Sequence, residues 1–570
     1  MLDVAIVGGE VIDGTGAPRR RADVGIRDGR IVQVGSLDEK AHRRIDAEGK
    51  VVTPGLIDVH THYDAQWAWD ATLSPSLFHG VTTALAGNCG FTLAPMEEEA
   101  AGYLTAMLAR VEGMPLASLR QGLDIHWRSF AEFLGAVDGN VAINVGFMVG
   151  HSTVRRLTLG DDWRRPATEA EIATMGRMVA DSLGAGALGF SSSWSETHND
   201  AGGDPVPSRF ATEDELVQLS SEVRSHPGTW LEFLPWASGP FPDDRSLLMA
   251  KMSAAAKRPL NWNLLTVRPE ISDEAIGNRL GASDLARRHG GAVYGLTLPV
   301  PQTLYLNLGS GFLFDSLPEW AEVLAHPHRE KVRLLADASV RRRLVDAAGS
   351  APRIWYDHDR LRFEHVDCDR YSDAAGLTVA DAARQRGSDP WDLFFDVSVA
   401  DELRTVMVVP PQGDDPESWQ RRVRLWRDDR TIIGGSDAGA HLDMLDTFGY
   451  FTDFLGPTVR DRQLLPLEEA VRMVTDDAAR AFGLTGRGRV AEGYAADIVV
   501  FDEDRIGSEP VHARVDLPAD GMRLYAGATG IDCVLVNGEP VAESGVATGA
   551  RPGTVLRSGR DTHTVPIRAS

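Results

Sequence analysis

The sequence has little of three features that mark particular classes of protein. It contains three cysteines, Cys89, Cys368 and Cys533, which are too few and too scattered for a framework of disulfide bonds. No apolar run approaches the roughly 18 residues that a membrane-spanning helix needs. The first residues also lack a charged segment followed by an apolar core. We therefore expect a protein of the reducing cytoplasm without a membrane partner.

Positive charge is scarce as well. The sequence holds 58 lysines and arginines against 82 acidic residues, a formal net charge of -24. Binding to phosphate backbones depends on concentrated basic residues, and short clusters such as residues 19–21 are typical of solvated surfaces. The composition argues against a nucleic-acid partner. The partner that we expect, on the motifs described below, is a small-molecule substrate. It leaves open whether the chain forms a homo-oligomer.

Both ends of the chain predict short β-strands. Residues 4–7, 22–26 and 30–34 are short alternating segments between glycine and aspartate turns. The same pattern of short alternating segments recurs after Gly486, at residues 496–501 and 532–538. Neither end has enough strands to bury a two-sided sheet. We expect residues 1–54 and 486–570 to combine into one small β-sandwich.

Residues 55–485 alternate between predicted strands and helices, as a parallel α/β barrel of the (β/α)8 type requires. Capping-box patterns predict helices beginning after Thr168, with an end near Gly184, and after Thr212. Buried strands are predicted at residues 141–145, 187–191, 229–233, 260–264 and 431–435. Residues from about 300 to 425 show no such repeat. We interpret them as an insertion or lid that closes over the site.

Two histidines at the end of a strand are the strongest chemical motif. The apolar residues 51–59 lead into His60 and His62, after a break at Pro54 and Gly55. Residues two apart on a strand point to the same face, so both imidazoles can bind one metal ion. The alternative, two surface histidines by chance, does not explain the apolar run before them.

These residues, together with residues 63–66 and 87–91, resemble the amidohydrolase superfamily and, within it, the D-aminoacylase (N-acyl-D-amino-acid deacylase) branch. The resemblance covers nearly the whole chain. It implies a barrel with a small sandwich domain from both termini. It also implies metal-dependent hydrolysis of the amide bond of an N-acyl amino acid of D configuration.

The resemblance assigns roles to two further residues. Asp437 follows the apolar residues 431–435 and corresponds to the aspartate that binds the metal and takes the proton of the attacking water. On its own, Asp437 is equally compatible with a helix N-cap. Cys89 corresponds to a metal-ligating cysteine, and its alternative is a small buried hydrophobic side chain.

The sequence departs from this branch at two strands. D-aminoacylases carry further metal-binding histidines on the fifth and sixth strands, but residues 230–233 and 261–264 contain none. We place Phe233 and Leu264 at the histidine positions. Glu232 and Asn263 then face the site only if the register is shifted by one residue. We therefore predict one zinc ion, bound by His60, His62, Cys89 and Asp437. A catalytic zinc also needs a coordination position for water, so we expect Cys89 either to lie close to the zinc or to bind it only weakly.

Other polar residues are candidates for substrate binding. His151 follows the predicted strand at 141–145, and a structural hydrogen-bonding role is the alternative. His198 and Arg209 lie on the long loop after the fourth strand, where Arg209 is suited to clamp a carboxylate or to remain a solvated surface residue. His441 follows Asp437 on the same rim, where it is suited to bind substrate or orient Asp437, and a simple helix-start residue is the alternative. Glu232 and Asn263 join this group if their register permits.

Three functions follow from these features. The first is a metal-dependent hydrolase of N-acyl-D-amino acids or related amides. The second is a single-metal enzyme on the same scaffold that opens a cyclic amide, imide or lactone, or performs a non-hydrolytic lyase step. The third is a catalytically silent binding protein, which would have no chemical need for His60, His62 and Asp437.

Overall fold

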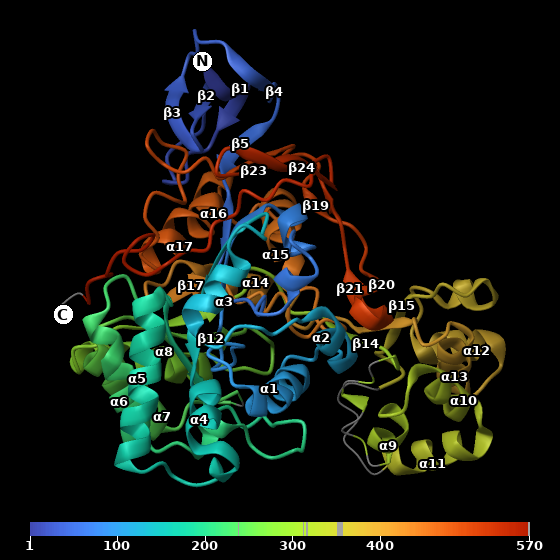
Figure 1. Cartoon of the computed structure of the whole chain (residues 1–570). Coiled ribbons are helices and arrows are strands. Elements are labelled where there is room, and N and C mark those ends of the chain that lie inside the picture. Colours follow the sequence, from blue (N-terminus) through green and yellow to red (C-terminus); the bar gives the residue numbers. More distant parts are fainter. Residues whose placement is uncertain are drawn as a thin grey trace.

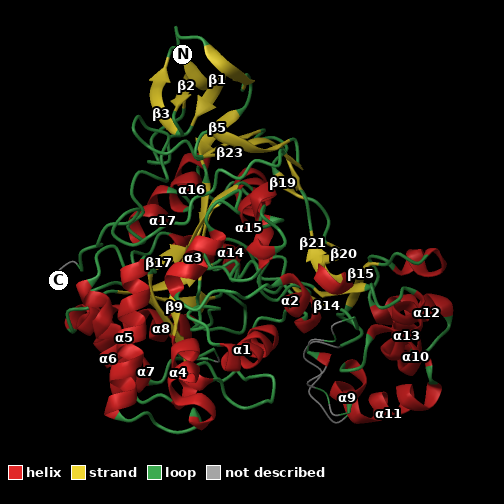
Figure 2. Cartoon of the chain, viewed as in Figure 1, coloured by secondary structure: helices red, strands yellow, loops and turns green. Residues whose placement is uncertain are grey.

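A computed structural model describes residues 1–570 except 238, 310, 312, 315, 316, 318, 350–356 and 568–570. Three units are visible in Figure 1: a sheet that holds the N-terminal strands, a central α/β unit, and a separate group of helices α9–α13. Figure 2 shows helices on the outside of the central strands. No helix among the described residues combines the length and apolarity that crossing a membrane demands.

Strands from both ends of the chain form one sheet. Its order is β25-β24-β23-β18-β5-β1-β2-β3, and β4 also pairs with β1. β5 and β18 pair antiparallel and join the two ends. Residues of both halves, such as Val24 and Leu535, share one hydrophobic core. The strands of both termini thus lie in one continuous nine-stranded sheet.

The strands of the terminal sheet are β1 (Leu2–Val11), β2 (Arg20–Arg27), β3 (Arg30–Gly35), β4 (Ala41–Asp46), β5 (Val51–Pro54), β18 (Ile498–Phe501), β23 (Ile531–Val536), β24 (Glu539–Glu543) and β25 (Val546–Ala547).

Residues beyond this sheet return to the central unit. Val555 forms a parallel bridge with Val145, and Leu556 N donates to Val145 O at 2.7 Å. The C-terminal segment therefore does more than complete the predicted sandwich, because its last part packs along a central strand.

The central unit has its strands parallel and in chain order. They are β6 (Leu56–Asp58), β7 (Val81–Ala86), β8 (Asn144–Phe147), β9 (Val149–Gly150), β10 (Gly189–Ser193), β11 (Trp230–Leu234), β12 (Leu260–Leu265), β13 (Val293–Thr297) and β17 (Thr431–Ile433).

Hydrogen bonds divide these strands into two sheets, β6-β7-β8 and β17-β13-β12-β11-β10-β9. The sheets adjoin at both edges. Only Met148 separates β8 from β9, and Thr61, just after β6, forms a parallel bridge with Ala438, after β17. This mixed α/β arrangement brings the residues after β6 and those after β17 together.

The helices of the central unit are α1 (Glu98–Val111), α2 (Leu116–Gly122), α3 (Phe130–Val137), α4 (His151–Leu159), α5 (Glu169–Ala185), α6 (Glu213–Glu222), α7 (Asp243–Ala256), α8 (Asp273–Arg288), α14 (Pro416–Trp426), α15 (Tyr450–Asp453), α16 (Leu467–Met473) and α17 (Asp476–Ala481).

The predicted helix starts are confirmed. Thr168 caps α5 through a complete capping box with Glu171, and Thr212 accepts a hydrogen bond from the Glu215 amide at the start of α6. Strand boundaries shift by up to three residues. β8 begins at Asn144 rather than 141, because Val141 O accepts a hydrogen bond from Gly553 N of the C-terminal segment.

The segment between β13 and α14 has a core of its own. Its antiparallel sheet β14-β16-β15 packs with helices whose buried side chains include Trp320, Phe394 and Phe395. Its elements are β14 (Leu304–Leu306), α9 (Trp320–Leu324), α10 (His328–Ala336), α11 (Ala338–Ala348), β15 (Arg362–His365), α12 (Val379–Arg386), α13 (Pro390–Ala400) and β16 (Val406–Val409). The helices lie beside the central unit in Figure 1. The segment thus has a hydrophobic core separate from that of the central strands.

Candidate metal and catalytic site

His60 and His62 lie just after β6, at the carboxyl end of the strand. Both side chains are buried, at 0% and 2% exposure. The Thr61–Ala438 bridge keeps this stretch extended against the residues after β17. Donor atoms of His60, His62 and Cys89 all lie within 4.8 Å of one another. The fold therefore brings the predicted histidine pair and Cys89 into one cluster.

Cys89 reaches this cluster from the turn after β7. Its backbone has a positive φ of 55°, a conformation that non-glycine residues seldom adopt. The Cys89 Sγ atom lies 3.7 Å from His60 Nε2, and the Cys89 amide donates to Glu232 Oε2 at 2.8 Å. The turn thus aims the sulfur at the imidazole while a carboxylate holds the backbone.

Asp437 approaches from the opposite side, after β17. Its Oδ1 atom is 3.2 Å from His60 Nε2 and 3.8 Å from His62 Nε2. Asp437 and His441 both have positive φ values, of 53° and 47°. A Cβ atom on the neighbouring Gly439 would lie only 2.7 Å from His62 O, so this loop needs glycine there. Backbone strain of this kind is typical of functional sites.

Glu232 and Asn263 face the site, which corrects the register that put Phe233 and Leu264 at the histidine positions. Glu232 accepts from the Cys89 amide, and Asn263 Nδ2 is 3.2 Å from His60 Nε2. Side chains alternate along a strand, so a shift of one residue exchanges the two faces. The strands β11 and β12, the fifth and sixth of the expected barrel, therefore contribute a carboxyl group and an amide.

Glu112 also belongs to the site, although no motif in the sequence indicates it. It directly follows α1, its side chain is 3% exposed, and its Oε1 atom is 3.4 Å from His62 Nδ1. An acidic residue between a helix and Gly113 is typical of an exposed helix end. Only the tertiary fold brings it to His62.

The charged groups strongly affect one another. Burial opposes ionisation of Asp437, but the hydrogen bond and positive charge of His60 lower the pKa of Asp437 to about 2. Burial raises the pKa of Glu232 to about 7 and that of Glu112 well above its ordinary range. Burial and the nearby Glu232 raise the pKa of the Cys89 thiol. Two buried carboxyl groups and the partly exposed Asp437 thus meet with little compensating positive charge.

The donor set fits a divalent cation. Imidazole nitrogen, thiolate sulfur and carboxylate oxygen are the ligands that zinc binds in proteins. Glu112 Oε1, Glu232 Oε1 and Asn263 Oδ1 are buried and have no hydrogen-bond partner among the described residues. A cation would compensate the charge that burial makes costly.

A cavity of 760 Å³, which we call the site cavity, opens onto this cluster. Its lining includes His62, Cys89, Glu112, Asn263 and Asp437, together with His198 and His441 from the predicted rim. His198 Nδ1 is 2.8 Å from Ser193 Oγ. Burial and the nearby His441 lower the pKa of His198 to about 3. Both rim histidines are therefore placed where a substrate would lie.

Three predicted substrate-binding residues do not line the site cavity: His151, Arg209 and Glu232, the last of which reaches the Cys89 amide instead. His151 is fully buried, with its ring nitrogens 2.8 Å from Ser192 Oγ and 2.9 Å from Glu215 Oε1. Arg209 donates to His198 O at 3.1 Å and to Asn199 Oδ1 at 2.8 Å. His151 therefore has the structural environment given as its alternative, while Arg209 braces the loop that carries His198.

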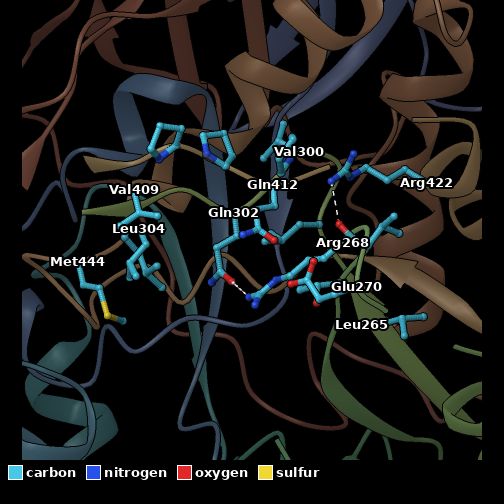
Figure 3. Close-up of a pocket in the computed structure, with 17 residues that line it drawn as sticks. Leu265, Arg268, Glu270, Val300, Gln302, Leu304, Val409, Gln412, Arg422 and Met444 are labelled. Carbon is cyan, nitrogen blue, oxygen red and sulfur yellow. Dashed lines mark hydrogen bonds between the residues drawn. The ribbon is translucent and has the colours of Figure 1, made fainter. Parts of the chain in front are cut away.

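A smaller pocket of 280 Å³, which we call the side pocket, adjoins the site cavity. The two share Leu265, Thr266, Arg268, Glu270 and Gln302. Figure 3 shows the Arg268 side chain reaching toward Gln302, and Arg268 Nη2 lies 3.4 Å from Gln302 Oε1. The rest of the side pocket is largely apolar, with Val300, Leu304, Val409, Met444 and Leu445 among its lining.

Among the described residues, the insertion contributes little to the site cavity. Gln302, just before β14, lines it, whereas none of the described residues from 304 to 425 does. A lid formed by the insertion has no support in this arrangement. Residues of the loops after β11 and β12 contribute much of the lining instead.

Known proteins match this chain in sequence and in fold. A model of the amidohydrolase family matches residues 43–542. The chain therefore belongs to the amidohydrolase family. It is a metal-dependent hydrolase of carbon–nitrogen bonds other than peptide bonds, in the D-aminoacylase branch.

Relatives match over nearly their full length. The D-aminoacylase of Alcaligenes xylosoxydans xylosoxydans is 28% identical, with 97% of each chain covered. The N-acyl-D-glutamate deacylase of the same organism is 30% identical, with 98% of this chain and 96% of the relative covered.

A solved structure of D-aminoacylase is similar at a TM-score of 0.65 and 28% identity, covering 98% of this chain and all of the other. That D-aminoacylase has a binuclear metal centre in which one metal activates and the second attenuates. The similarity supports the fold and the presence of a divalent metal site in this family.

Proposed function

We propose that the chain hydrolyses the amide bond of an N-acyl amino acid of D configuration, on an eight-stranded barrel and with one metal ion, most simply zinc. The convergence of His60, His62, Cys89 and Asp437 on one point carries this proposal. The D-aminoacylase and D-glutamate deacylase relatives support the substrate class.

Metal binding, proton transfer and substrate binding fall to different side chains. A divalent ion bound by His60, His62 and Asp437 would activate water and polarise the scissile carbonyl. Asp437 accepts the proton of the attacking water and passes it to the leaving nitrogen, because its low pKa keeps it ionised before the reaction. His198 and His441 contact the substrate from the rim.

One metal is the stoichiometry that the donor set favours. The fifth and sixth strands present Glu232 and Asn263 rather than two imidazoles, and the Oε2 atom of Glu232 already accepts from the Cys89 amide. An amide oxygen is a weak zinc ligand compared with imidazole. We therefore expect the second metal position to bind zinc poorly.

The same substitution favours a second candidate function. A site with a carboxyl group and an amide in place of two imidazoles suits a single-metal hydrolase of a cyclic amide, imide or lactone, or a lyase on the same scaffold. Such enzymes need one activated water or one Lewis acid. A substrate panel separates the two candidates.

Metal content and activity test the proposal together. Purified protein is expected to hold one zinc per chain and to hydrolyse N-acyl-D-amino acids, with activity lost on chelation and restored by zinc. Asp437→Ala is expected to lose at least about 100-fold in kcat, the usual range for a missing general base. The measurements are elemental analysis and a panel of D and L substrates beside cyclic amides and esters.

Asp214→Asn serves as the matched control, because Asp214 is exposed on α6, where Gln218 donates to it. Two tightly bound zinc ions would refute the single-metal assignment. Full activity of Asp437→Ala would refute the general base. Turnover of cyclic substrates alone would favour the second candidate.

A further inference from the structure

Glu112 approaches His62 on the side of its ring away from Asp437. The Glu112 Oε1 atom is 3.4 Å from His62 Nδ1, whereas His62 Nε2 is 3.8 Å from Asp437 Oδ1. We propose that Glu112 is a positioning residue that holds His62 with its Nδ1–H toward the carboxylate. The Nε2 lone pair then points into the metal site.

The two nitrogens of a neutral imidazole have different roles, which explains why such a partner matters. One nitrogen carries hydrogen and donates, and only the other has a lone pair for a metal. A carboxylate beside Nδ1 selects the form with hydrogen on Nδ1. It also fixes the ring orientation and makes Nε2 a stronger ligand.

The backbone of Glu112 is fixed on both sides, so its approach to His62 is not a chance conformation of a long side chain. The Glu112 amide donates to Leu108 O at 2.9 Å, and its carbonyl accepts from His441 N at 2.5 Å. The residue therefore connects the end of α1 to the loop after Asp437.

Burial gives the same indication. The Glu112 side chain is 3% exposed, and Oε1 has no hydrogen-bond partner among the described residues other than this approach to His62. A buried carboxylate without a partner is destabilising. Contact with a metal-bound imidazole gives the carboxylate a partner and explains why an acid is tolerated here.

The inference rests on the metal site of the proposed function, so its test measures metal binding rather than turnover. Metal-free wild type, Glu112→Ala, Glu112→Gln and Glu112→Asp are titrated with Co²⁺ against a competing chelator. We expect the Co²⁺ affinity of Glu112→Ala to fall 10- to 100-fold, the usual effect of removing such a partner. Glu112→Gln keeps an acceptor oxygen and should lose less, with a changed Co²⁺ absorption spectrum.

Glu98→Gln is the matched control, since Glu98 lies on α1, the helix that Glu112 follows, and its side chain is 85% exposed. A purely structural role would lower the thermal stability of the metal-free variants and leave Co²⁺ affinity within twofold of wild type. That result in the near-isosteric Glu112→Gln and in Glu112→Ala would overturn the inference. Wild type that binds no Co²⁺ would overturn it too.

The outcomes remain distinguishable from failure of the proposed function. If wild type binds Co²⁺ but hydrolyses no N-acyl-D-amino acid, the substrate assignment fails. The affinity series still decides the role of Glu112, because it requires no substrate.

Discussion

Arg268 combines a positive charge with a position at the junction of the site cavity and the side pocket. Among the described residues that line the site cavity, the arginines are Arg268 and Arg279, and there is no lysine. Arg279 donates to three backbone carbonyls, those of Ala237, Gly239 and Leu264. Arg268 is exposed and makes one long side-chain hydrogen bond, to Gln302. It is therefore better placed than Arg209 to bind a substrate carboxylate.

Replacing Arg268 tests this assignment. Arg268→Ala should raise KM for an N-acyl-D-amino acid about 10- to 100-fold, as loss of a charged hydrogen bond predicts. The matching N-acyl-D-amino-acid amide has no carboxylate, so its KM should barely change. Arg268→Lys should recover part of the loss. Steady-state kinetics on both substrates measure the effect, with Arg288→Ala, an exposed site on α8, as control. An equal loss on both substrates would contradict the assignment.

The individual site residues differ in how far the sequence can predict them. His60, His62 and Asp437 lie next to apolar strands, so their neighbours in the chain reveal their position. Glu232 and Asn263 require the register of a strand, which a one-residue error reverses. The role of Glu112 depends on where the end of α1 packs, and no neighbouring residue in the sequence indicates that contact.

At the scale of elements, His79 joins three segments of the chain. It ends the short helix Ser76–His79, and its Nδ1 atom is 2.7 Å from Thr452 Oγ1 of α15. Its Nε2 atom is 3.1 Å from Ala526 O, just after β21 (Gly521–Tyr525). The ring is fully buried. Burial lowers the pKa of His79 to about 4, although the contact with Ala526 O acts in the opposite direction.

This pKa predicts a pH dependence of stability. The unfolded chain binds a proton at His79 below its ordinary pKa of 6.5, whereas the folded chain resists protonation until about pH 4. The contribution of the neutral His79 ring to the free energy of unfolding is complete above pH 6.5 and is lost as the pH falls toward 4. The full effect is about 3 kcal/mol, from the free energy of one pKa unit. Denaturant unfolding of the metal-free protein from pH 7 to 4 should show a flatter profile for His79→Gln.

The control for His79 is His289→Gln, an exposed histidine after α8. It should follow the wild-type profile. Parallel profiles for wild type and His79→Gln would show that the ring is protonated equally in the folded and unfolded chains.

Local signals predict elements well and their ends poorly. Thr168 and Thr212 fix the starts of α5 and α6, because a cap is a contact between residues three apart. The start of β8 was wrong because Val141 hydrogen-bonds to Gly553. A partner more than 400 residues away leaves no trace in the local pattern.

For the whole molecule, the C-terminal segment holds the terminal sheet against the central unit. Asn144 in β8 is fully buried, and its side chain donates to Asp497 Oδ2 at 3.1 Å and to Thr82 O at 3.0 Å. Its Oδ1 atom accepts from Asn537 Nδ2 at 2.8 Å and from Thr554 N at 3.1 Å. One amide thus connects a central strand to three points of the last 80 or so residues of the chain.

Removing that amide should loosen the whole connection. Asn144→Ala leaves buried partners unsatisfied, so the free energy of unfolding should fall by about 2–3 kcal/mol. The Thr554 amide loses its acceptor, and hydrogen exchange of residues 553–556 should accelerate while exchange in α5 stays unchanged. Asn140→Ala, at an exposed position just before β8, is the control and should change the free energy by less than about 0.5 kcal/mol. Unchanged exchange at residues 553–556 in Asn144→Ala would show that the return of the chain to β8, and not this side chain, holds the two units together.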